Sequence, residues 1–167
     1  TGGGQDPENM QMGSRIHRKI QRQMGSDYQA EVPLKTEIVC EGFTLKIEGR
    51  ADGLIHTKEQ VMVDEIKGVL RELDRVQEPV GIHLAQAKCY ASMVAEQEGV
   101  DEIGVQMTYC QMETEEVKRF QYSYQKNELK VWFDEVIRQY EKWAKFQIEW
   151  RKARNASIKG IEFPFPY

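Results

Sequence analysis

The sequence lacks the features that mark a secreted, membrane-spanning or thiolate-metal protein. It has no hydrophobic run long enough to cross a membrane, and its first residues carry no signal-peptide pattern. Among 167 residues there are only three cysteines, widely spaced and without a CxxC pair: Cys40, Cys89 and Cys110. This argues against a disulfide framework and against a zinc or iron–sulfur site built from these cysteines alone. It favours reduced thiols in a cytoplasmic protein.

Excess positive charge is also missing. The chain has 23 Lys and Arg residues against 27 Asp and Glu residues, which gives a net charge of −4. A protein that coats nucleic acid regardless of sequence is usually basic, so the charge argues against that class. A nuclease remains compatible, because acids that bind metal lower the net charge while local basic patches hold phosphate.

The remaining composition is that of one soluble domain, 40% hydrophobic and 30% charged, with room for a core. We expect residues 1–6 to be a flexible glycine-rich leader, residues 7–160 a single domain and residues 161–167 a tail. Hydrophobic spacing predicts a helix over 7–24, strands over 32–40, 43–49, 51–56 and 61–67, a helix over 81–97, strands over 103–110 and 117–124, and a helix over 126–154. This order predicts an α/β fold with a central mixed sheet flanked by helices.

The candidate catalytic residues lie in one short stretch, from Asp52 to Lys67. Glu65 and Lys67 are two positions apart in a predicted strand, so both side chains project from the same face. A buried charge is costly unless it is paired or bound to metal. Asp52 lies on the neighbouring predicted strand, and its carboxylate, that of Glu65 and the backbone carbonyl of Ile66 are oxygen ligands of the kind that Mg²⁺ takes. An exposed ion pair between Glu65 and Lys67 at a strand edge is the alternative interpretation.

These residues resemble the PD-(D/E)XK nuclease superfamily, and within it the RecB-like exonuclease branch. Asp52 matches the first acid of the family, and Glu65-Ile66-Lys67 matches its (D/E)xK signature. The resemblance implies a restriction-endonuclease-like core that binds Mg²⁺ or Mn²⁺. It also implies that Asp52, Glu65 and the carbonyl of Ile66 bind the metal, and that Asp52, Glu65 and Lys67 are catalytic.

Two further motifs resemble the RecB-like branch. Gln86-Ala87-Lys88-Cys89-Tyr90 looks like its QxxxY helix motif, which implies that Gln86 and Tyr90 hold DNA or support the site. Gly13-Ser14-Arg15-Ile16-His17 resembles its GxxxH motif, which implies that His17 is a metal ligand. The alternatives are a solvated histidine on a surface helix and, for Gln86 and Tyr90, simple packing one helical turn apart.

The resemblance also frames the expected function. It implies a metal-dependent deoxyribonuclease, an exonuclease of DNA repair or recombination, whose partner is single-stranded DNA or duplex ends. Some RecB-like exonucleases hold an iron–sulfur cluster with four cysteines, but no cysteine follows Cys110, so no such cluster is expected. The last residues, Phe163-Pro164-Phe165-Pro166-Tyr167, resemble the segment that opens the motor domain of XPD/DinG-type helicases. The alternative is therefore a non-catalytic DNA-binding or docking domain attached to a helicase.

Overall fold

The computed structural model describes the backbone of residues 7–40 and 42–152, so the expected leader (1–6) and tail (161–167) lie outside the described residues. Within these ranges the elements are α1 (Pro7–Gln23), β1 (Tyr28–Cys40), β2 (Phe43–His56), β3 (Val61–Val69), a short 3-10 helix η1 (Leu73–Arg75), α2 (Gly81–Glu98), β4 (Glu102–Gln111), β5 (Val117–Gln125) and α3 (Lys126–Lys152).

The strands form one mixed sheet within the described part of the chain. Its five strands lie in the order β1-β2-β3-β4-β5. The β3–β4 pair is parallel and the other neighbours are antiparallel. A parallel pair needs a crossover connection, and α2 supplies it between β3 and β4. This confirms the predicted α/β fold with a central mixed sheet flanked by helices.

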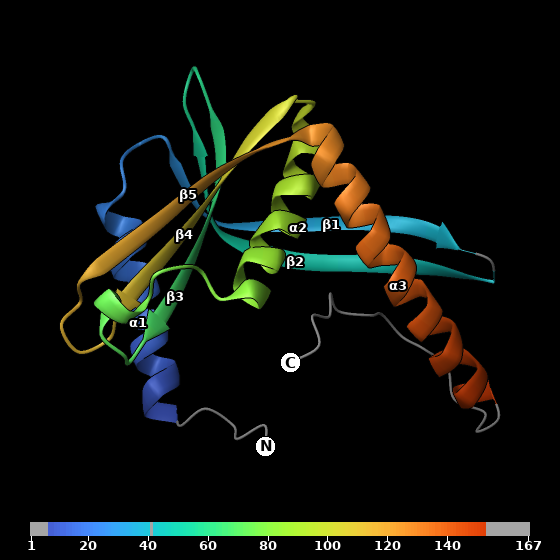
Figure 1. Cartoon of the computed structure of the whole chain (residues 1–167), viewed down its shortest axis with the longest axis horizontal. Coiled ribbons are helices and arrows are strands. Elements are labelled where there is room, and N and C mark those ends of the chain that lie inside the picture. Colours follow the sequence, from blue (N-terminus) through green and yellow to red (C-terminus); the bar gives the residue numbers. More distant parts are fainter. Residues whose placement is uncertain (1–6, 41, 153–167) are drawn as a thin grey trace.

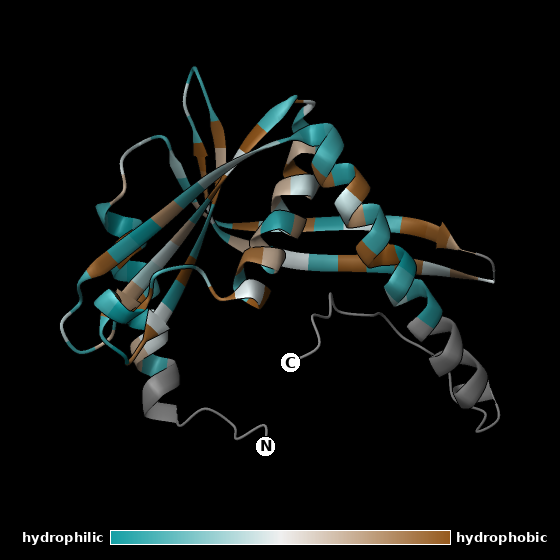
Figure 2. Cartoon of the chain, in the orientation of Figure 1, coloured by the Kyte–Doolittle hydropathy of each residue, from teal (hydrophilic) through white to brown (hydrophobic). Residues whose placement is uncertain are grey.

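Helices cover both faces of the sheet. Figure 1 shows α2 and α3 on the near face and α1 behind the strands. The larger part of the core lies under α2 and α3, while α1 packs on a small cluster made of Ile16, Ile20, Ile66 and Cys110. Hydrophobic and hydrophilic segments alternate along β1 and β2, as expected when one face of a strand is covered (Figure 2). None of the described helices is both long and apolar enough to cross a lipid bilayer.

β2 is one continuous strand, whereas the sequence predicted two strands separated at Arg50. The predicted interruption at Arg50 was wrong, and the two glycines on either side of it pack against tyrosine rings within the strand. A Cβ atom at Gly49 would collide with the ring of Tyr90, and one at Gly53 would collide with the hydroxyl end of Tyr28. These glycines let two tyrosine rings lie directly on the backbone of an unbroken strand.

The sheet divides next to the predicted site. β2 pairs with β3 over four residue pairs only, from Gly53–Asp64 to His56–Val61. β2 then continues beside β1 alone, and Figure 1 shows this hairpin extending away from β3, β4 and β5. Asp52 and Glu65 lie next to the Gly53–Asp64 pair, at the end of the ladder where the two strands separate. We call these two residues, with Gly53 and Asp64, the fork.

Candidate functional site

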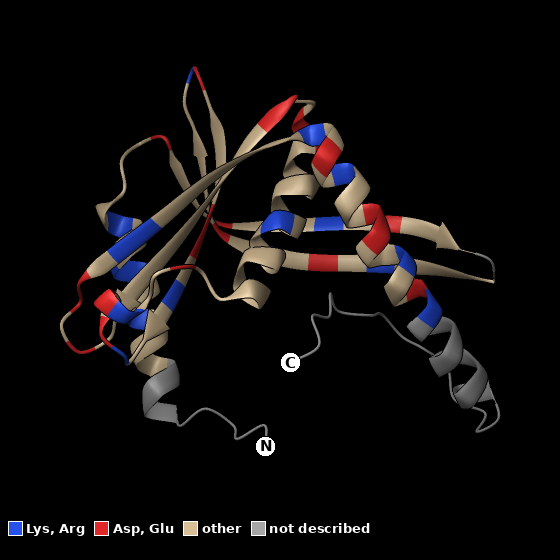
Figure 3. Cartoon of the chain, in the orientation of Figure 1, with Lys and Arg blue, Asp and Glu red and all other residues tan. Residues whose placement is uncertain are grey.

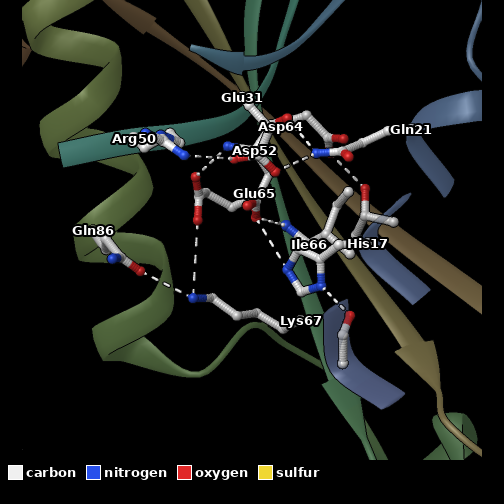
Figure 4. A network of polar contacts seen from close by, with 12 residues as sticks. His17, Gln21, Glu31, Arg50, Asp52, Asp64, Glu65, Ile66, Lys67 and Gln86 are labelled. Atoms are coloured by element: carbon white, nitrogen blue, oxygen red, sulfur yellow. Dashed lines mark hydrogen bonds and ion pairs between the residues drawn. The ribbon is translucent and has the colours of Figure 1, made fainter. Parts of the chain in front are cut away.

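At the fork, each of the two predicted acids accepts a hydrogen bond from a backbone amide of the neighbouring strand. The backbone amide of Ile66 donates to Asp52 Oδ2 at 2.7 Å, and the backbone amide of Asp52 donates to Glu65 Oε1 at 3.2 Å (Figure 4). These two bonds lie where the regular ladder between β2 and β3 has ended. Side-chain carboxylates therefore take the place of backbone carbonyls, and the carboxylates of Asp52 and Glu65 are brought together as predicted.

Glu65 is a buried carboxylate with little compensating charge. The residue is only 3% exposed. Burial, and then the negative charge of Asp52, raise the pKa of Glu65 well above its ordinary value, while Lys67 acts in the opposite direction. Lys67 Nζ lies 3.9 Å from Glu65 Oε2, which is an ion pair at the limit of contact. The structure thus contradicts an exposed strand-edge pair, because the acid is buried and a second acid lies beside it.

Lys67 is positioned by the helix that carries the predicted QxxxY motif. Its Nζ donates to Gln86 Oε1 at 3.0 Å, and Gln86 Nε2 donates to the hydroxyl of Tyr90 at 3.3 Å. Tyr90 is buried, with its ring on the backbone of Gly49. The chain Lys67–Gln86–Tyr90 therefore joins β3 to β2 through α2, and both helix residues lie next to the predicted catalytic lysine.

His17 reaches the fork from the opposite side, on α1. Its Nδ1 lies 2.7 Å from the carbonyl oxygen of Gly13, so Nδ1 carries the hydrogen and donates it. Nε2 then faces Asp52 Oδ2 at 3.5 Å. Burial alone would lower the pKa of His17, but the hydrogen bond and charge of Asp52, with further backbone acceptors, raise it overall. In the neutral ring the lone pair of Nε2 points toward the acids, which is the geometry that a histidine ligand needs.

The donor set at the fork fits a hard divalent cation. Within the described residues, no group of three or more His, Cys, Asp and Glu side chains is close enough to form a metal site by itself. What the fork offers is two carboxylates at one point, a pKa of Glu65 raised by burial and then by the charge of Asp52, and a histidine nitrogen facing one of the acids. The metal-ligand set of His17, Asp52, Glu65 and the Ile66 carbonyl stays a prediction.

A cleft opens beside the fork. Its volume is about 960 Å³, and the side chains and backbone that line it include Gly13, His17, Arg18, Gln21, Glu31, Arg50, Ile66, Lys67, Leu70 and His83. The lining contains three basic residues, Arg18, Arg50 and Lys67, and one acidic residue, Glu31. The cleft is therefore locally basic in a chain of net negative charge. Such a lining suits a phosphate backbone.

Two polar residues beside Asp52 were missed in the sequence. Gln21 Nε2 lies 2.9 Å from both the backbone carbonyl of Asp52 and Glu31 Oε1. Glu31, with a φ of 55°, lies between the pairs Ala30–Gly53 and Val32–Ala51 of the β1–β2 register. Its Oε2 lies 4.0 Å from the Arg50 guanidinium. The signal for Gln21 was its position one helical turn after His17, on the same face of the helix. No sequence pattern pointed to Glu31.

Asp64 is a second buried carboxylate that the sequence did not single out. It is fully buried and accepts hydrogen bonds from the Tyr28 hydroxyl at 2.7 Å, Thr108 Oγ1 at 2.6 Å and Gln106 Nε2 at 3.2 Å. Burial, followed by the charge of Asp64, raises the pKa of Tyr28, so the phenol stays a donor. Alternation along the strand places Asp64 and Ile66 on the face opposite Glu65 and Lys67. The partners of Asp64 come from two other strands, β1 and β4, which alternation does not identify.

The other two histidines differ in position. His56 Nε2 pairs with Glu98 Oε1 at 2.6 Å on the surface. His83 lines the cleft, and its Nδ1 lies 3.1 Å from the hydroxyl of Tyr109. Burial, and then the charges of Lys67 and Arg71, lower the pKa of His83 to about 4. His83 is therefore neutral at physiological pH, although it lies close to cations.

Comparisons with known proteins agree with this fold. A solved structure described as "Crystal structure of SSO0001" superposes with a TM-score of 0.50 at 19% sequence identity. The match covers 74% of this chain and 56% of that chain, so the chain spans little more than half of that protein's length, and at this identity the likeness shows the fold alone. No curated protein matches the chain in sequence. A sequence model of the PD-(D/E)XK nuclease superfamily matches residues 4–156. The chain therefore belongs to the PD-(D/E)XK nuclease superfamily.

Proposed function

We propose that the protein is a metal-dependent deoxyribonuclease that hydrolyses DNA phosphodiester bonds at the fork. The observation that carries the proposal is the meeting of Asp52, Glu65 and Lys67 beside a basic cleft, with both acids held by backbone amides. A cluster of two carboxylates and one amine at a buried point has no structural advantage, because the acids repel each other. It has a chemical use if a divalent cation neutralises the acids during hydrolysis.

Each residue then has a defined role. Asp52, Glu65, His17 and the Ile66 carbonyl would hold Mg²⁺ or Mn²⁺, which when bound supplies charge neutralisation and an activated water. Lys67, held by Gln86, places an ammonium where charge develops on the scissile phosphate and orients the attacking water. Tyr90 supports Gln86, and Arg18 and Arg50 line the cleft where the phosphate backbone would lie.

The finer assignment follows from the helix motifs. Contacts of Gln86 with Lys67 and of His17 with Asp52 support membership of the RecB-like branch, and hence an exonuclease that acts in repair or recombination in the cytoplasm. The non-catalytic, helicase-attached alternative predicts DNA binding without cleavage. Its supporting segment, residues 161–167, lies outside the described residues.

The first experiment measures cleavage of labelled single-stranded and duplex DNA with Mg²⁺ or Mn²⁺. We expect degradation with either DNA or both, abolished by EDTA and by Lys67→Ala. Lys46→Ala is the matched control, because Lys46 is an exposed lysine paired with Glu48 on the distant hairpin, and it should cleave like the unchanged protein. Intact DNA under every metal condition, with DNA binding retained, would instead support the non-catalytic alternative.

The second experiment locates the cation. Crystals soaked in Mn²⁺ should show anomalous density between Asp52 and Glu65. By calorimetry, Asp52→Ala should weaken Mn²⁺ binding and Lys67→Ala should leave it intact. Manganese density elsewhere on the chain, with none at the fork, would overturn the assignment of these ligands.

A further inference from the structure

A row of aromatic rings follows the outer strand β5 on the face that α2 covers. Phe120, Tyr122 and Tyr124 alternate along this strand, so their side chains share one face at a spacing of about 6.6–6.8 Å. Tyr122 and Tyr124 are stacked, with ring centroids 6.4 Å apart and an interplanar angle of 26°. Among the described residues at the margin of the core, Phe120 and Tyr124 pack against it and Tyr122 does not. The ring of Tyr122 is therefore half-buried and contacts Tyr124 at the margin of the core.

A fully buried tyrosine, Tyr109, connects the row to the cleft. The ring of His83, which lines the cleft, lies 5.9 Å from that of Tyr109, and Tyr109 lies edge-on to Phe120 at the same centroid distance. From Phe120 the row leads through Tyr122 and Tyr124 to the start of α3. Figure 1 shows β5 along the outer edge of the sheet, beside α2, ending where α3 begins.

Lysines lie between these rings. Lys88 Nζ is 4.2 Å from the ring centroid of Trp132 and 5.2 Å from that of Tyr124, and Lys118 Nζ is 5.4 Å from that of Phe120. Figure 3 shows basic segments on both β5 and α2. Cation–π contacts of this kind fix an ammonium beside a ring face. The row thus presents cations and planar rings in alternation, and we call it the β5 track: Lys88, Lys118, Phe120, Tyr122, Tyr124 and Trp132.

We propose that the β5 track binds single-stranded DNA beside the cleft; this rests on the proposed function of the fork. Rings that stack on bases, with cations that meet phosphates, are the means by which proteins bind single strands without reading sequence. The bases of a duplex are stacked on each other and paired, so they cannot lie on Tyr122. The track therefore selects single-stranded DNA, and its contact with the cleft through the buried Tyr109 places the bound strand close to the cleft.

The test measures binding of a labelled oligothymidylate to the full chain by fluorescence anisotropy in EDTA, where no cleavage occurs. Stacking on one ring contributes enough that Tyr122→Ala should raise the Kd at least about fivefold. Tyr122→Phe keeps the ring and should bind like the unchanged protein, whereas Tyr122→Leu keeps apolar bulk without a stacking plane and should bind like Tyr122→Ala. Phe43→Ala removes a half-buried ring from the distant hairpin, and it should leave the Kd unchanged. Thermal melting of each variant shows that it is folded.

The outcomes separate this inference from the proposed function. Unchanged affinity in Tyr122→Ala, or tighter binding to duplex than to single strands, overturns the track even if the protein cleaves DNA. Absence of binding to any single strand also overturns it, and would indicate that the rings contact a protein partner. Ring-dependent binding in a protein that does not cleave DNA supports the track, and the proposed nuclease activity alone then fails.

Discussion

Asp64 and Glu65 are adjacent on β3, both are buried, and their environments are opposite. Asp64 accepts three hydrogen bonds from neutral donors, supplied by Tyr28, Thr108 and Gln106. Glu65 accepts one from a backbone amide and has a lysine ammonium at 3.9 Å and a second carboxylate beside it. One face of the strand thus holds a carboxylate with three neutral donors, and the other face holds a carboxylate with one amide donor and a second acid beside it.

This difference shows that burial alone does not identify a functional acid. A buried carboxylate surrounded by committed donors stabilises a fold, because its lone pairs are used. A buried carboxylate next to another one, with a single ammonium at the limit of contact, is destabilised by repulsion that a bound cation would relieve. The predictions below test this contrast, beginning with the largest effect.

Glu65→Gln should remove activity and preserve the fold. Loss of one ligand charge at the fork should lower the cleavage rate at least about 1,000-fold, since metal-ion charge stabilisation contributes several kcal/mol. The free energy of unfolding should not fall, because the substitution removes a poorly compensated buried charge. Single-turnover cleavage and urea denaturation measure the two quantities. A variant that unfolds easily would show that Glu65 is as structural as Asp64.

Asp64→Ala should have the reverse effect, with stability lost first. Removing the carboxylate leaves the Tyr28 hydroxyl, Thr108 and Gln106 without their acceptor, which should cost about 3 kcal/mol of unfolding free energy. Tyr28→Phe, which removes one donor only, should cost about 1 kcal/mol. Urea midpoints test both. Full stability of Asp64→Ala would remove the contrast between the two acids.

Gly53→Ala should destabilise the fork by about 2 kcal/mol, because the added methyl group overlaps the hydroxyl end of Tyr28. The double variant with Tyr28→Ala should show strong coupling, since without the ring the methyl group has space. Gly42→Ala is unsuitable as a control because that glycine has a φ of 84°. Gly81→Ala, where a Cβ meets nothing within 4 Å, is the matched one, and it should leave the unfolding free energy close to that of the unchanged protein.

The smallest expected effect concerns His83, whose pKa is lowered by burial and by nearby cations. His83 should titrate near pH 4 in the folded chain, against about 6.5 when unfolded, because burial and then Lys67 and Arg71 disfavour its charged form. The stability that its neutral ring contributes is complete above pH 6.5 and is lost as the pH falls toward 4. NMR titration of the ring protons measures this pKa. A midpoint near 6.5 would show that these cations do not act on the ring.

Much of this architecture was predictable from local patterns. Alternation placed Glu65 and Lys67 on one face and Asp64 and Ile66 on the other, and hydrophobic spacing gave the order of helices and strands. What failed was anything that depends on distant partners. The rings of Tyr90 and Tyr28, which lie on Gly49 and Gly53, come from α2 and β1, far from these glycines in the sequence. The donors around Asp64 come from β1 and β4, and no local pattern connects them.

The tyrosine–glycine contacts have an evolutionary consequence. A ring lying on bare backbone means that positions 28 and 53 cannot change independently, and neither can positions 90 and 49. Among descendants of this sequence, a lineage that replaces Tyr28 with a small residue is released from its need for glycine at 53, while one that keeps the ring is not. We therefore expect substitutions at positions 28 and 53, and at positions 90 and 49, to occur in pairs among related sequences.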